Sequence, residues 1–324
     1  MKTLAGARAA GWILLLLWLG PVGTRAADVL GYSVLKGQFL LQTDAEVLEP
    51  DPDFAFSLLV SVDLTDFDLL ANASFSGPGG AAEAMDDLGD YWSFLEVQQT
   101  LEALNAAYEW GDYTLDFESV TEGPFSCVLH LAETPLPPTP KLVNFADVQA
   151  VDATKPLTLT WDFTEPPPPD DFVQVYVSLG HASIYATPGL GQEGALNGAS
   201  RSITIPPDTL DPGLIYSLNL EITRVVATNS DCYPDADGAA GTFSSTEVDL
   251  ITVVPPELRL LSRPANGLIS LEVVAEPDQT VVLQGSENLL TWSDLDTNTA
   301  PDGTNIFNVP AVVRVMQVFR ALQR

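Results

Sequence analysis

Short runs that alternate apolar and polar residues recur through most of the chain, and they constrain its fold more than any other feature. The clearest run, Leu157 to Trp161, reads L-T-L-T-W, and glycine, proline or aspartate separates it from similar runs. Alternation with period two places every second side chain on one face of a strand, which is typical of half-buried antiparallel sheets. The sequence therefore predicts an all-β protein of tandem antiparallel β-sandwich-like domains.

One segment departs from this pattern. Thr100 can cap the free amides of a helix, Leu101, Leu104 and Tyr108 recur at helical spacing, and Gly111 follows as a stop signal. We expect one short helix here, in the first domain.

The first 26 residues have the pattern of a secretory signal peptide. Lys2 and Arg8 precede the apolar run Trp12 to Leu19, and small residues lead to Ala26. We expect cleavage after Ala26 and a secreted product, extracellular or in the cell envelope. No later segment is apolar enough to span a bilayer, so we expect no membrane span in the cleaved chain.

Two proline-rich segments, Thr134 to Pro140 and Val254 to Pro256, divide the remaining sequence. Proline stiffens a linker and cannot join a central strand. We therefore predict three domains with separate cores, at residues 27–139, 140–255 and 256–324, and we expect proteases to cut first at the two joints.

Acidic residues dominate the composition, with 44 Asp and Glu against 13 Lys and Arg and a net charge of −31. The acidity is greatest in residues 27–139, where Lys36 is the single lysine or arginine. A chain of this charge is repelled by phosphate, so nucleic acids and anionic membrane surfaces are excluded as partners.

The middle of the chain resembles fibronectin-type-III and immunoglobulin-like sandwiches. The resemblance rests on Trp161 in an early strand, on Tyr216 after a Pro-Gly turn, and on the loop sequence from Pro206 to Tyr216. Some other antiparallel sandwich is the alternative.

The C-terminal segment resembles another module. Val282 to Thr297 reads V-L-Q-G-S-E-N-L-L-T-W-S-D-L-D-T, and Phe319-Arg320 follows near the end. This is similar to a β-module at the end of secreted proteins of planctomycete and verrucomicrobial bacteria, which implies an exported bacterial protein. The pattern predicts a strand at Val281 to Gly285, a polar turn at Ser286 to Asn288, and a small core closed by Leu289, Trp292 and Leu295.

No catalytic constellation stands out. Gly189-Leu-Gly-Gln-Glu-Gly194 matches a dinucleotide-binding fingerprint, but no helix follows it. The two histidines, His130 and His181, lie in an alternating strand and a turn, so we assign no catalytic residue and expect His130 to point outward. The missing constellation favours a non-catalytic protein, and an enzyme is the alternative.

Candidate binding residues are few. Tyr91, Trp92 and Trp110 could stack on sugar rings, whereas Trp161 and Trp292 are expected in cores. Asp231, Asp235 and Asp237 form a candidate calcium site, with a solvated acidic turn as the alternative, and we expect no other cofactor. Cys127 and Cys232 are expected to be unpaired thiols, with an inter-domain disulfide as the alternative.

Two functions remain. The first is an exported, non-catalytic modular protein for adhesion, matrix or envelope contact, or binding of a protein or glycan partner, acting as a monomer. The second is a small exported glycan hydrolase with a carboxylate site in the first domain.

Overall fold

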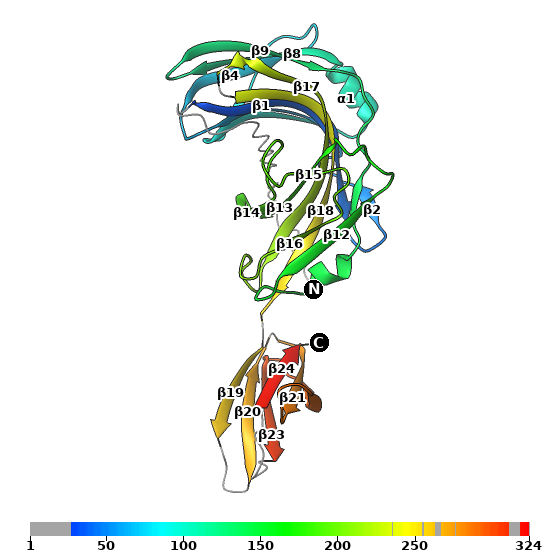
Figure 1. Cartoon of the computed structure of the whole chain (residues 1–324), viewed down its shortest axis with the longest axis vertical. Coiled ribbons are helices and arrows are strands. Elements are labelled where there is room, and N and C mark those ends of the chain that lie inside the picture. Colours follow the sequence, from blue (N-terminus) through cyan, green and yellow to red (C-terminus); the bar gives the residue numbers. More distant parts are fainter. Residues whose placement is uncertain are drawn as a thin grey trace. The chain divides into compact units, whose positions relative to one another are not determined.

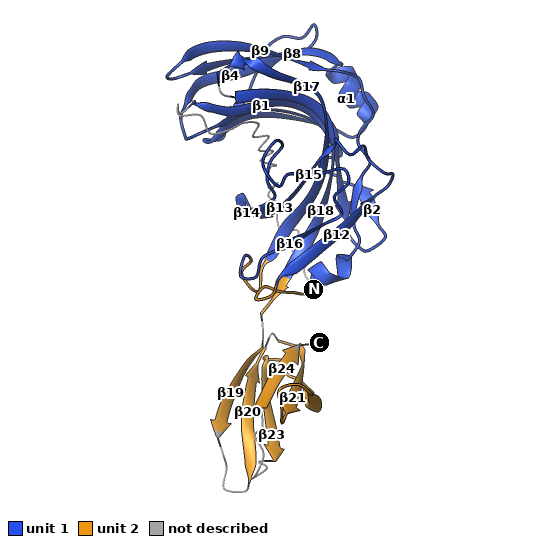
Figure 2. Ribbon diagram, in the orientation of Figure 1, with its two compact units in different colours: residues 1–149, 156–209, 215–251 blue, residues 150–155, 210–214, 252–324 orange. Residues whose placement is uncertain are grey.

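The computed structural model describes residues 27–234, 236–254, 256–262, 267–275, 277–310 and 318–323. The expected signal peptide lies outside them. Two compact units are present: unit 1 holds residues 1–149, 156–209 and 215–251, and unit 2 holds 150–155, 210–214 and 252–324 (Figure 2). The predicted all-β class is confirmed. So is the short helix, because α1 (Leu101–Ala107) begins after Thr100, whose side chain accepts a hydrogen bond from the Ala103 amide.

An 11-stranded sheet runs through unit 1 (Figure 1). Three of its strands are 14 to 19 residues long, and two of these, β17 (Ile215–Tyr233) and β18 (Ala236–Val253), pair antiparallel as a hairpin. The strand order is β14 (Ala182–Ala186), β13 (Phe172–Leu179), β17 (Ile215–Tyr233), β18 (Ala236–Val253), β1 (Val29–Gln42), β3 (Phe56–Leu64), β7 (Tyr91–Gln98) and β6 (Asp86–Asp87); β2 (Leu48–Pro50), β11 (Val151–Asp152) and β15 (Leu196–Asn197) pair at its margins.

The prediction of separate cores for residues 27–139 and 140–255 is wrong. Strands β1 and β18 pair in parallel from Gly31 opposite Asp237 to Leu41 opposite Glu247. Each predicted domain therefore contributes half of one continuous sheet. The pairing joins residues more than 200 positions apart, and such a contact leaves no mark in local sequence.

Two glycines allow this parallel pair to form. A Cβ atom on Gly37 would lie 2.5 Å from Cδ1 of Phe243, and one on Gly238 would lie 2.1 Å from Cε2 of Tyr32. Each aromatic ring thus lies across the backbone of the glycine on the neighbouring strand, on opposite faces of the sheet.

One face of the long sheet, here called the outer face, is covered by two smaller sheets. The first sheet packs on it through a core that includes Tyr32, Val60, Phe75, Tyr113 and Leu129. Its strand order is β5 (Glu83–Ala84), β4 (Leu70–Ser76), β8 (Gly111–Ser119) and β9 (Gly123–Leu131); the second sheet is β10 (Pro140–Leu142), β12 (Leu157–Phe163) and β16 (Ser202–Ile205). Trp161 of β12 is 2% exposed, so its predicted place in a core is confirmed.

The proline segment Thr134 to Pro140 crosses the outer face between the two sheets. Ser244 Oγ donates to the Pro137 carbonyl at 2.7 Å, and Thr246 Oγ1 donates to the Pro140 carbonyl at 2.6 Å. Prolines lack an amide hydrogen, so this segment cannot pair with the sheet as a regular strand. Its buried carbonyls still need donors, and hydroxyls on alternate residues of β18 supply them. The segment is fastened to the sheet, which disfavours the cleavage expected at this joint; the order of proteolysis stays a prediction.

Unit 2 contains a sandwich of two three-stranded sheets whose core includes Leu271, Val281 and Phe307. The strand predicted at Val281 to Gly285 is confirmed within β21. The sheets are β19 (Glu257–Ser262), β20 (Leu268–Val274) and β23 (Thr304–Pro310), and β22 (Ser293–Thr299), β21 (Thr280–Ser286) and β24 (Val318–Gln323).

The predicted closure of this module over Trp292 is wrong. Leu289 and Leu295 are 54% and 46% exposed, and Trp292 lies half-buried with the Arg320 guanidinium 4.2 Å from its ring centroid. Phe307, at 1% exposure, is the aromatic residue in the core. The polar turn does form, since Ser286 Oγ accepts from the Leu289 amide at 2.8 Å.

Candidate functional site

The second face of the long sheet, here called the inner face, is the candidate site. It is defined by alternate residues that share a face through their strand register: 91, 93, 95 and 97 of β7; 57, 59, 61 and 63 of β3; 33, 35, 37, 39 and 41 of β1; 239, 241, 243, 245 and 247 of β18; 217, 219, 221, 223 and 225 of β17; and 172, 174, 176 and 178 of β13. In Figure 1 the sheet bends, with β8 and β9 outside the bend and the segment bearing β15 inside it.

The middle of the inner face is apolar. Leu35, Leu59, Phe172 and Phe243 are buried in one cluster, and the rings of Phe39 and Phe243 lie 5.0 Å apart. Among the described residues, Leu190 and Ala195 are the side chains from outside the sheet that pack on this cluster. Leu190 lies in the glycine-rich segment from Gly189 to Gly194 and Ala195 directly follows it, so this segment is used for packing.

A row of polar side chains follows on β13, β17 and β18. Gln174 stands opposite Glu221, which stands opposite Ser245, and Tyr176 stands opposite Asn219. All five residues are buried, with exposures between 0% and 8%. We call these five residues the polar row.

Half of the buried side-chain atoms without a hydrogen-bond partner in the described structure lie in the polar row, and most lie on the inner face. Of eight buried side-chain oxygen or nitrogen atoms without a partner there, six lie on the inner face: those of Ser57, Gln174, Tyr176, Ser178, Glu221 and Ser245. The Tyr176 and Ser245 hydroxyls approach one another without the geometry of a hydrogen bond. A buried polar group left unpaired costs about 1–3 kcal/mol, so this concentration on one face indicates a surface built to receive hydrogen bonds.

Glu221 dominates the electrostatics of the row. Burial raises the pKa of this carboxyl to about 8, and the hydrogen bond from Thr223 to Oε1 at 3.0 Å only partly opposes the shift. Oε2 has no partner. At neutral pH the group is therefore mostly a neutral acid, which both donates and accepts a hydrogen bond.

A second buried carboxyl lies at the other end of the inner face. Asp63 is 5% exposed, and burial, followed by the nearby charge of Asp90, raises its pKa to about 7. Its cross-strand neighbour is Tyr91, whose pKa is raised by burial and then by Asp90 and Asp63. The proximity of Asp90 to Asp63 could not be predicted from a sequence with 44 acidic residues.

The three predicted aromatic binding residues do not meet on one surface. Tyr91 and Trp92 are successive residues of β7 and so point to opposite faces of the sheet, with Trp92 packed on the outer core. Trp110 also packs against that core, and the Lys36 ammonium lies 3.9 Å from its ring centroid. Their role as a glycan platform remains a prediction.

Lys36 is a buried lysine that sequence reasoning passed over. Its Nζ donates to the carbonyl of Tyr108, at the end of α1, at 2.6 Å and to Asn105 Oδ1 at 3.2 Å. Burial lowers its pKa to about 8. These contacts hold the helix against the sheet, which gives Lys36 a structural role.

The calcium candidates are only partly described. Asp235 lies outside the described residues, and Asp231 is exposed at the end of β17. Burial raises the pKa of Asp237. The described residues contain no group of three or more His, Cys, Asp or Glu side chains placed to hold a metal ion. Calcium binding remains a prediction.

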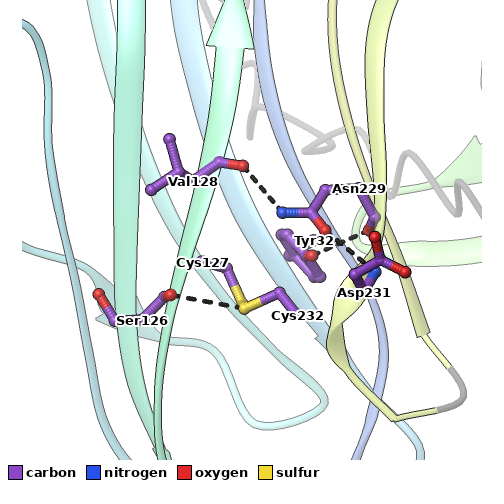
Figure 3. Close-up of a disulfide and its surroundings, with 7 residues drawn as sticks. All are labelled: Tyr32, Ser126, Cys127, Val128, Asn229, Asp231 and Cys232. Atoms are coloured by element: carbon purple, nitrogen blue, oxygen red, sulfur yellow. Dashed lines mark hydrogen bonds between the residues drawn. A yellow bond between two sulfur atoms is a disulfide. The ribbon is translucent and has the colours of Figure 1, made fainter.

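The expectation of unpaired thiols is wrong, because Cys127 and Cys232 form a disulfide (Figure 3). It joins β9 to the end of β17. Asn229 Nδ2 also donates to the Val128 carbonyl at 3.0 Å beside it. Nearby, the outward position expected for His130 is confirmed, since it is exposed and lies 2.6 Å from Asp112.

No family model matches the chain, and no curated protein matches it. No helix in the described part of the chain has the length and apolar character to cross a membrane.

Solved structures show weak similarity. The FN1-FN3 domains of chicken CNTN1 share 10% identity over 88% of this chain and 98% of theirs, with a TM-score of 0.22. A tetra-tandem repeat from the extending region of a large adhesion protein shares 11% over 91% and 74%, with a TM-score of 0.20. Fibronectin(III)-like modules of Clostridium thermocellum CbhA share 12% over 67% and 90%, also at 0.20. Scores this low carry no argument about the chain's function.

Proposed function

We propose that this chain is an exported, non-catalytic binding protein that contacts its ligand or partner through the inner face of the long sheet. The observation that carries the proposal is the set of buried polar groups without partners on that face, which a bound molecule would satisfy.

Export is supported by two features. The N-terminal sequence has the order of a signal peptide, and the disulfide between Cys127 and Cys232 favours an oxidising compartment. The function belongs with adhesion, matrix or envelope contact, and the partner is a protein, a glycan or a smaller molecule. A monomer is the simplest state for this role.

The experiment is a thermal-stability screen of the full chain with envelope polysaccharides, peptides and amphiphiles. A ligand at 100 times its Kd stabilises the folded state by about 2.7 kcal/mol, so at least one class should raise the Tm. Leu59→Arg, which places a charge in the middle of the inner face, should lose the shift. Equal shifts in wild type and this variant would reject the inner face as the binding surface.

The alternative function is a glycan hydrolase that uses Asp63 and Asp90. Burial and the charge of Asp90 raise the pKa of Asp63 to about 7, and a carboxyl with a pKa near neutrality can serve as a general acid or base. If this alternative holds, the chain should release reducing sugar from a polysaccharide, and Asp63→Asn should abolish the release. The binding proposal expects no release from either protein.

A further inference from the structure

Apolar and polar side chains occupy different parts of the inner face. Its middle is apolar, formed by Leu35, Leu59, Phe243 and their neighbours, and the polar row lies beside it on β13, β17 and β18. Ala239 and Ser245 of β18 are six positions apart, which is roughly 20 Å of strand. Because these residues are buried and Leu190 and Ala195 already pack on the apolar part, a ligand must take the place of those two side chains. To cover both parts it needs an elongated apolar body and a polar head at one end.

The polar row also restricts the charge of that head. The inner face as defined above contains no lysine or arginine, and its ionisable acids are Asp63, Glu221 and Glu247. An anionic head would lose its hydration without gaining a counter-charge, which is strongly unfavourable in a buried site.

The unsatisfied atoms define what the head must offer. Gln174 Oε1 is an acceptor that needs a donor, whereas the hydroxyls of Tyr176 and Ser245 can each donate or accept. Hydroxyl and amide groups also donate and accept, and they carry no charge. An uncharged polyol or amide head therefore complements the row better than a carboxylate or a phosphate.

We propose that the inner face binds an amphiphile with an elongated apolar body and an uncharged hydroxyl- or amide-bearing head, the body lying on Leu35, Leu59 and Phe243 and the head on the polar row. The inference rests on the proposed binding function and names the class of its ligand.

The test uses the full chain with its disulfide intact and a neutral fluorescent naphthylamine that brightens in apolar sites. Three competitors separate body from head: monolauroylglycerol, laurate and glycerol. Monolauroylglycerol is the ester, with an uncharged glycerol head. Laurate has the same acyl chain but a carboxylate head, and glycerol is the uncharged head without the chain. We expect the ester to displace the dye at a concentration at least about tenfold lower than laurate, since about 1.4 kcal/mol corresponds to tenfold. Glycerol should not displace it.

Two variants assign the two parts of the ligand. Gln174→Leu removes an acceptor from the polar row at similar volume, so it should abolish the preference for the ester over laurate. Gln99→Leu, the same change at an exposed site outside the inner face, should alter neither this preference nor the dye affinity. Leu59→Arg should abolish dye binding, and Phe39→Ala, a milder change at the half-buried edge, should weaken it if Leu59→Arg does not fold.

The outcomes separate the two proposals. If laurate competes as well as the ester, or if Gln174→Leu still prefers the ester over laurate, the polar row does not bind the head. The proposed ligand class is then wrong, while binding by the inner face stands. If wild type does not bind the dye, or the folded Leu59 and Phe39 variants bind it unchanged, the inner face is not an apolar binding surface and both proposals fail.

Discussion

Single residues decide where this fold tolerates polarity in buried positions. Lys36 and Glu221 are both 0% exposed, but their charged groups differ in how many hydrogen-bond partners the fold gives them. The Lys36 ammonium has two hydrogen-bond acceptors and an aromatic ring, whereas Glu221 keeps one oxygen without a partner. Because Lys36 is satisfied within the fold, we regard it as structural; because Glu221 is not, we regard it as functional.

The Glu221 carboxyl should make stability depend on pH. Its folded pKa of about 8 exceeds the ordinary value of 4.5, so the folded state binds more protons than the unfolded state between these values. Its contribution is complete below the unfolded pKa and is lost as the pH rises toward about 8, by up to about 1.4 kcal/mol per pH unit. Asp63 has the same sign up to about pH 7.

We therefore expect the free energy of unfolding in urea to fall between pH 6 and pH 8 in wild type, and to fall less in Glu221→Gln, which cannot ionise. The exposed Glu118→Gln serves as the control and should follow wild type. Lys36, with its pKa lowered to about 8, opposes the trend only above that range. Identical slopes for wild type and Glu221→Gln would show that Glu221 does not titrate in this window.

Among the elements, β18 does the most to organise unit 1. One face of the strand carries Ala240, Thr242, Ser244 and Thr246, which pack on the outer core or bind the proline segment. The other face carries Phe243 and Ser245 of the inner face. Period-two alternation therefore lets one strand support the structural core and the candidate site at once.

The hairpin of β17 and β18 is fastened to β9 by the disulfide, which closes 105 residues of sequence. Such a cross-link restricts the unfolded chain, and its removal should cost about 2–5 kcal/mol. We expect a lower urea midpoint for the Cys127→Ala, Cys232→Ala double variant, and also for wild type unfolded under reducing conditions. An unchanged midpoint in reduced wild type would show that the hairpin is held by packing alone.

At the scale of the whole molecule, residues 27–139 are not an independent domain. In isolation they would lose the β18 partner of β1, and their core would lose Tyr233, Ala236 and Ala240. The fragment 27–139 should therefore lack a cooperative thermal transition by circular dichroism, whereas 27–255 should show one. A cooperative transition in the shorter fragment would mean that the β1 half of the sheet is stable without β18.

The sequence by itself determined the local features of this protein. Alternation at Leu157 to Trp161 predicted a strand with a buried tryptophan, Thr100 predicted the start of the helix, and Ser286 to Asn288 predicted a turn. These signals arise from side chains within a few residues of one another, so they can be read without knowing the rest of the fold.

Tertiary structure decided the features that join distant parts of the chain. The pairing of β1 with β18, the disulfide and the polar row each bring together residues that are remote in sequence. Glu221 is one acid among 44, and only burial beside Gln174 and Ser245 distinguishes it. Local patterns report that a strand exists; which strands meet, and which polar groups are then enclosed without partners, depends on long-range packing.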